Sequence, residues 1–230
     1  MRWIPRRALE ARLTAALKRA PVTLLLGPRQ CGKTSIARRL AERERATLFD
    51  LEDPETPLTR DTLALNLRDE KGLVIIDECQ REPALFSYLR VLADRKPLRA
   101  RFLLLGSASP ELVRGVSESL AGRVTHVEME GFTLDEVGAK HDQLLWRRGG
   151  LPASYLARNE DESYRWRLDF VRTHLERDLP ALGIRIPAVA LLQGWDFLGK
   201  VLLWKKSSAA LMRTGIPTFM GLTGAPNWTF

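Results

Sequence analysis

The sequence predicts an α/β fold in which a parallel five-stranded sheet is flanked by helices on both faces. Five apolar runs alternate with stretches of helical spacing, a pattern typical of parallel sheets; the runs are residues 22–27, 47–51, 73–77, 102–106 and 124–129. A glycine-rich segment follows the first run directly, and two acidic residues follow the third. Because open α/β sheets bind ligands at the carboxyl ends of their strands, we expect both segments at one edge of the sheet.

The helices are predicted from apolar residues that recur at helical spacing. One is expected over residues 6–18, a second from residue 33 onward and a third over residues 85–94. From residue 141 to residue 193 the pattern is helical with many arginines, which predicts a small helical lid. The expected organisation is therefore a core over 1–140, a helical lid-like region over 141–196 and an atypical tail over 197–230.

Residues 27–34 read Gly-Pro-Arg-Gln-Cys-Gly-Lys-Thr and match the phosphate-binding pattern G-x-x-x-x-G-K-[ST] between a strand and a helix. Backbone N–H groups and the start of the helix would bind an anion there. Lys33 is expected to reach the β- and γ-phosphates of ATP, and the Thr34 hydroxyl to bind Mg²⁺. The alternative is a glycine-rich turn that binds nothing. The residues expected to line the nucleotide site are Gly27, Pro28, Arg29, Gln30, Cys31, Gly32, Lys33, Thr34 and Ser35.

Cys31 lies close to Lys33 and to a helix N-terminus, a setting that lowers a thiol pKa. We nevertheless expect this cysteine to fill space in the loop, since most cysteines are inert.

Residues 73–80 read Leu-Val-Ile-Ile-Asp-Glu-Cys-Gln, so a buried strand ends in two carboxylates. Asp77 is expected to hold the Mg²⁺ shell, and Glu78 to deprotonate the attacking water. A kinase that transfers phosphate to a substrate hydroxyl needs no such glutamate, so the pair favours hydrolysis. Two solvated acids at a strand end are the alternative.

Three further residues are candidates for a role near the nucleotide. Ser107 follows the fourth apolar run, where it would lie between the loop and the acidic pair and could sense the γ-phosphate. Ser109 is either a second such group or a helix cap. Arg123 precedes the last run, and we place it near the nucleotide edge as an arginine finger, with a plain surface arginine as the alternative.

An ordered set of motifs over about residues 1–193 resembles the bacterial and archaeal AAA+ ATPases that carry a C-terminal domain of unknown function. The matching segments are residues 25–34, 50–54, 76–83, 105–109, 119–123, 149–152 and 176–178. The resemblance implies an AAA+ P-loop core with strand order 5-1-4-3-2, ATP and Mg²⁺ as ligands, and a winged-helix segment and a further domain beyond the core. It also implies arginine fingers that act between subunits, hence a homo-oligomer, and a protein partner of unknown identity.

The tail at residues 197–230 contains no Asp or Glu, whereas about four are expected at the average frequency of the chain. We interpret it as a departure from the ancestral reading frame that truncates the protein; a divergent or disordered tail is the alternative. Four of its residues are basic and supply half of the net charge of +8, so the charge gives only weak support for nucleic acid binding.

The chain is expected to be cytoplasmic. It has no apolar run of about 18 residues that would predict a membrane span. Its basic N-terminus lacks the apolar segment of a secretory signal, and its two cysteines do not suggest a disulfide framework.

The leading hypothesis is an AAA+ ATPase that hydrolyses ATP with Mg²⁺. A second hypothesis is a nucleotide-binding remnant or regulatory module without useful turnover, because its C-terminal domains are missing. A third is a small-molecule kinase that uses the same loop, which Glu78 disfavours.

Overall fold

The computed structural model describes residues 3–56, 58–107 and 109–181, without the side chains of 110, 111 and 174–181. The expected atypical tail and the end of the expected helical region lie outside the described residues. The chain divides into two compact units, residues 1–166 and 167–230. The boundaries expected at residues 140 and 196 stay predictions.

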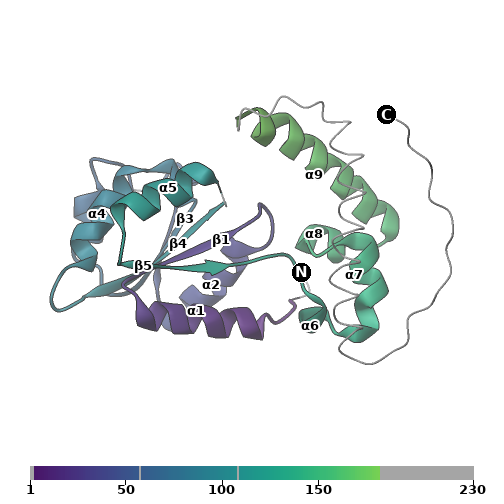
Figure 1. The fold of residues 1–230 in the computed structure, drawn as a ribbon, viewed down its shortest axis with the longest axis horizontal. Helices are drawn as coiled ribbons and strands as arrows, with labels where there is room; N and C mark the ends of the chain where they lie inside the picture. Colours follow the sequence, from purple (N-terminus) through teal and green to yellow (C-terminus); the bar gives the residue numbers. More distant parts are fainter. Residues whose placement is uncertain (1–2, 57, 108, 182–230) are drawn as a thin grey trace, which may run out of the picture. The chain divides into compact units, whose positions relative to one another are not determined.

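The first unit is built on five parallel strands in the order β2-β3-β4-β1-β5 (Figure 1). The strands are β1 (Val22–Gly27), β2 (Thr47–Asp50), β3 (Gly72–Asp77), β4 (Ala100–Ser107) and β5 (Val124–Glu128). This confirms the predicted α/β sheet and the order implied by the resemblance. The order places β4 between β1 and β3, so the carboxyl end of β4 separates the glycine-rich loop from the acidic pair.

Helices cover both faces of the sheet, which is why its central strands are apolar on both sides (Figure 1). α1 (Arg7–Arg19) and α2 (Lys33–Glu44) pack on one face, against the layer that contains Leu25, Ile75 and Leu103. α3 (Leu63–Leu67), α4 (Ala84–Ala93) and α5 (Pro110–Ser119) pack on the other, against the layer that contains Leu24, Ile76 and Leu104. Alternate residues of one strand therefore belong to different cores.

After β5 the described chain is helical. Its elements are α6 (Leu134–Val137), the 3₁₀ turn η2 (Ala139–His141), α7 (Asp142–Arg148), α8 (Pro152–Tyr155) and α9 (Glu160–Ala181). The buried guanidinium of Arg148 joins the first unit's helices, because it donates to the carboxylate of Glu160 at 3.0 Å and to the carbonyl of Ala157 at 2.5 Å. In the part of the chain that the structure describes, no helix has the length and apolar character needed to cross a bilayer.

Candidate functional site

The loop between β1 and α2 needs glycine at both of its glycine positions. A Cβ on Gly27 would lie 2.3 Å from the carbonyl oxygen of Met129, which is backbone and cannot move aside easily. Gly32 has a φ of +98°, in the left-handed region that favours glycine. Its backbone forms the N-cap of α2, and no side chain caps this helix. The N–H groups at the start of α2 therefore face the loop without a side-chain acceptor from the cap residue.

Lys33 places a positive charge inside this loop. The residue is only 6% exposed. Its Nζ donates hydrogen bonds to the carbonyl oxygens of Gly27 at 2.8 Å and of Pro28 at 2.9 Å. Both of these partners are neutral carbonyl oxygens, so the ammonium group has no carboxylate partner among the hydrogen bonds described here, and it is placed to attract an anion that enters the loop.

Thr34 joins the loop to the acidic pair at the end of β3. Its Oγ1 donates to Asp77 Oδ2 at 2.6 Å, although the two residues are far apart in the sequence. The carboxylate of Asp77, 2% exposed, also accepts the backbone N–H of Glu78 at 2.9 Å. The structure therefore brings together the loop and the acidic pair, as we expected from the strand ends.

The oxygens of Thr34 and Asp77 are suited to Mg²⁺. Among the described residues, no group of three or more His, Cys, Asp or Glu side chains could hold a metal by itself. Mg²⁺ is usually bound by one or two protein oxygens and by substrate phosphates and water. A hydroxyl and a carboxylate in contact beside a phosphate-type loop fit that requirement, whereas they do not fit a site for zinc, which prefers sulfur and nitrogen ligands.

Glu78 follows Asp77 in an unusual backbone conformation, with a φ of +53° and a ψ of 41°. A residue other than glycine adopts this left-handed conformation at some cost, and such residues cluster at functional sites. The half-buried carboxylate accepts a hydrogen bond from the side-chain amide of Gln80, in the 3₁₀ turn η1 (Cys79–Arg81). Our sequence reasoning missed Gln80. An amide two residues after an acidic pair was the available signal.

The two serines after the fourth run have different positions. Ser107 ends β4 and pairs in register with Gly27, so it lies at the edge between the loop and the acidic pair. Ser109 is the N-cap of α5, and its hydroxyl accepts the backbone N–H of Leu112 at 3.3 Å. Of the two alternatives for Ser109, the structure shows the helix cap.

The expectation that Arg123 lies near the nucleotide edge is wrong. Arg123 precedes β5, and its carbonyl oxygen accepts the N–H of Val22 at the start of β1. It therefore lies at the amino edge of the parallel sheet, about 17 Å along β1 from Gly27 at about 3.3 Å per residue. Its guanidinium binds both carboxylate oxygens of Asp94, at 2.6 and 2.8 Å. This hydrogen bond raises the pKa of Arg123 and lowers that of Asp94.

Cys31 fills space under the loop, as expected. It is 1% exposed, and its Sγ lies 3.8 Å from the carbonyl oxygen of Met129. Burial raises the pKa of the Cys31 thiol, and the nearby Lys33 charge only partly opposes that effect. Burial, reinforced by the charges of Glu78 and Asp77, also raises the pKa of the Cys79 thiol.

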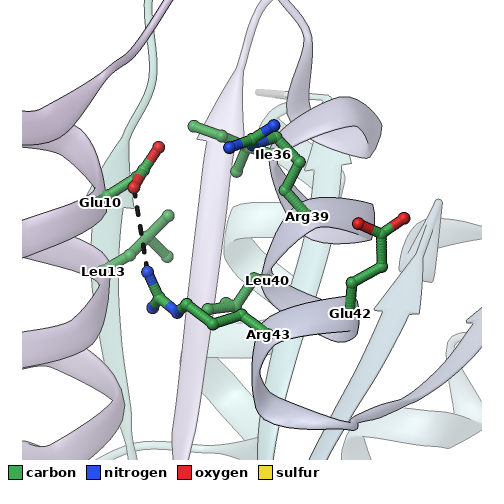
Figure 2. A pocket seen from close by; sticks show the side chains of 7 residues that line it. All are labelled: Glu10, Leu13, Ile36, Arg39, Leu40, Glu42 and Arg43. Atoms are coloured by element: carbon green, nitrogen blue, oxygen red, sulfur yellow. Dashed lines mark ion pairs between the residues drawn. The ribbon is translucent and has the colours of Figure 1, made fainter.

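A hollow of about 390 Å³ between α1 and α2 contains none of the candidate residues (Figure 2). It is lined by Glu10, Leu13, Ile36, Arg39, Leu40, Glu42 and Arg43. Its charges are balanced, and Arg43 lies 3.9 Å from Glu10 across the hollow (Figure 2). Because it lacks both the loop and the acidic pair, the candidate site remains at the carboxyl edge of the sheet.

Comparison with known proteins gives three findings. The family model AAA_14, described as an AAA domain, matches residues 19–138. Two uncharacterized proteins, Mb2031c of Mycobacterium bovis and Rv2008c of Mycobacterium tuberculosis, are each 50% identical over 195 residues. The match covers 85% of this chain and 44% of each relative, so the chain spans less than half of their length.

Among solved structures, the Walker-type ATPase PABY2304 of Pyrococcus abyssi is similar, with a TM-score of 0.54 and 17% sequence identity. The similarity covers 78% of this chain and 75% of that protein. At this identity the likeness concerns the fold, and it agrees with the sheet described above.

Proposed function

This chain belongs to the AAA domain family and so has a nucleotide-binding domain of the ATPase type, and from that premise we propose that it hydrolyses ATP to ADP and phosphate with Mg²⁺. The observation that carries the proposal is the 2.6 Å contact between Thr34 Oγ1 and Asp77 Oδ2. It joins a phosphate-type loop to an acidic pair, and hydrolysis needs both parts at one place.

The loop would hold the phosphates. Backbone N–H groups from Arg29 to Ser35 would bind their oxygens, and the buried ammonium of Lys33 would neutralise charge on the β- and γ-phosphates. Thr34 and Asp77 would hold Mg²⁺, which when bound withdraws charge from the phosphate oxygens.

Glu78 would act as the general base. Its carboxylate takes a proton from water as the water oxygen forms a bond to the γ-phosphorus and the bond to the bridging β-γ oxygen breaks. Ser107, at the edge between the loop and the acidic pair, would contact the γ-phosphate and sense its presence.

Arg123 lies at the opposite edge of the sheet, so we propose that it acts in the site of a second copy of this chain. The proposal supposes a homo-oligomer, in keeping with the resemblance. The protein partner that the hydrolysis would drive is unidentified.

Two substitutions test the proposal. Lys33→Ala should abolish ATP binding, because it removes the buried cation of the loop. Glu78→Gln should keep ATP binding and lose about 100-fold or more in turnover, because general-base catalysis contributes about that factor. Binding is measured by calorimetry and turnover by phosphate release.

Matched controls are Lys71→Ala and Glu118→Gln, which make the same changes at exposed positions and should leave both quantities unchanged. Unchanged hydrolysis in the Glu78 variant would remove the assignment of the base. ATP binding without hydrolysis by the wild type, at any protein concentration, would favour the second hypothesis, a nucleotide-binding module.

A further inference from the structure

We propose that Gln80 is a positioning residue that holds the carboxylate of Glu78 in place for the attack of water. The inference rests on the hydrolysis proposed above and assigns to it a residue that our sequence reasoning missed. Three features carry it: the contact of the Gln80 amide with Glu78, the backbone of Glu78, and the surroundings of the other amide atom.

The contact fixes the carboxylate from one side. Gln80 Nε2 donates to Glu78 Oε2 from the next turn of the chain. A hydrogen bond from an amide to an ionised carboxylate is charge-assisted and stronger than one between neutral groups. The carboxylate therefore has a preferred direction before any substrate arrives.

The backbone fixes the same residue from the other side. Glu78 has a φ of +53°, and its N–H donates to Asp77 Oδ1 at 2.9 Å. The left-handed conformation turns the chain sharply after β3 and leads directly into the turn that carries Gln80. The backbone conformation and the amide contact thus both constrain Glu78.

The carbonyl oxygen of the same amide is buried and has no hydrogen-bond partner among the described residues. It lies 3.0 Å from the point where a Cβ on Gly106 would stand. Cys79 Sγ and the Leu112 side chain also lie within 3.5 Å of that point. A buried acceptor without a partner normally costs stability.

Reversing the amide would not solve this problem. It would turn the carbonyl oxygen of Gln80 towards the carboxylate of Glu78, and two acceptors repel each other. The observed orientation is the one that lets the amide donate to Glu78. The fold thus leaves one acceptor unsatisfied while keeping the donor on the proposed base, and such conflicts between local and global preference are expected at functional sites.

The test is Gln80→Met, which keeps the length of the side chain and removes both the donor and the unpaired acceptor. Turnover should fall about 10- to 100-fold, the loss expected for a misplaced catalytic group. The dissociation constant for ATP should stay the same, and the Tm should stay the same or rise. The matched control is Gln143→Met on an exposed part of α7, which should change none of these quantities.

A double variant separates positioning from packing. In a Glu78→Gln background, Gln80→Met should lower the residual turnover by no more than about twofold, because a residue that acts only through Glu78 has nothing left to position.

Three results would overturn the role of Gln80. The first is that Gln80→Met turns over ATP as fast as the wild type. The others are that it lowers turnover by the same factor in the wild-type and Glu78→Gln proteins, or that its loss of turnover accompanies a lowered Tm. A wild type that binds ATP and releases no phosphate would instead overturn the proposed hydrolysis, and the positioning role with it.

Discussion

At the residue scale, the site consists of buried charges that are each satisfied by a short list of partners. Lys33 and Asp77 are 6% and 2% exposed. The first is held by two carbonyl oxygens, and the second by a hydroxyl and a backbone N–H. The electrostatic interactions of charges in such positions are strong, because little water screens them. Their partners are neutral, so the charges remain available to a nucleotide and its metal ion.

The two cysteines lead to a pH prediction at the same scale. Burial raises the pKa of Cys31 and Cys79 above the ordinary value of 9.0. A thiol whose folded pKa is raised contributes stability that is fully present below its unfolded pKa and is lost as the pH rises above it. The free energy of unfolding should therefore fall as the pH rises above about 9, because the unfolded thiols ionise first.

Urea unfolding of the wild type and of Cys79→Ala, at about pH 8 and about pH 10, measures this effect. The stability difference between the two proteins should shrink at the higher pH, since only the wild type loses the Cys79 contribution. A difference that stays constant would contradict the prediction. Comparing the two proteins cancels the titration of lysines and tyrosines that they share.

At the element scale, strand direction decides what meets what. All five strands are parallel, so the loop after β1, the acidic pair after β3 and Ser107 after β4 come to one edge. The same rule puts Arg123, which comes before β5, at the other edge. Whether a residue precedes or follows its strand thus decides how far it lies from the site, more than the number of residues that separate it from the site in the sequence.

Helix α5 permits a stability prediction. Gly115 lies inside this helix, and a Cβ there would meet the Phe86 ring at 3.5 Å, an ordinary van der Waals distance. Gly115→Ala should therefore stabilise the protein by about 0.5–1 kcal/mol, because glycine is a poor helix former. A higher urea midpoint with an unchanged m-value would show it.

Gly106→Ala is the contrasting control on the neighbouring strand β4. Its Cβ would lie 2.2 Å from Leu112 Cδ2, so this variant should lower the urea midpoint. A Gly115 variant that is also destabilised would show that the contact with Phe86 is tighter than an ordinary one.

At the scale of the whole molecule, the sheet separates the candidate nucleotide site from the Arg123–Asp94 ion pair. The candidate nucleotide site occupies the carboxyl edge, and the Arg123–Asp94 pair occupies the amino edge. A guanidinium at the amino edge cannot reach the phosphates of its own chain. If Arg123 contributes to hydrolysis, a second copy must place it there.

Turnover as a function of protein concentration tests that arrangement. Phosphate release per chain should rise with concentration in the wild type, because assembly would bring Arg123 to a neighbouring site. Arg123→Ala should bind ATP normally and lose the rise. Phosphate release per chain that is independent of protein concentration, and equal in the wild type and in Arg123→Ala, would show that each chain acts alone.

Asp94→Ala is the informative companion variant. It removes the partner of Arg123 and leaves the guanidinium in place. Asp94→Ala should keep the rise of turnover with protein concentration, because Arg123 itself remains able to reach a neighbouring site. Loss of that rise would show that Arg123 needs Asp94 to act.

The sequence by itself determined the α/β class, the five strands and the residues of the loop and the acidic pair. These features are local: apolar runs such as residues 73–77 reveal strands, and the loop pattern is contiguous in the chain. Even the meeting of Thr34 with Asp77 followed from the rule that parallel strands end at one edge.

Only the tertiary structure decided the ion pair of Arg123 with Asp94, the cap role of Ser109 and the contact of Gln80 with Glu78. Arg123 depends on Asp94, which is 29 residues away. Gln80 depends on a left-handed backbone and on the space that Gly106 leaves. The Arg123–Asp94 pair arises from long-range packing. The contacts of Ser109 and Gln80 are local in the sequence, but they depend on backbone conformations that the pattern of apolar residues does not specify.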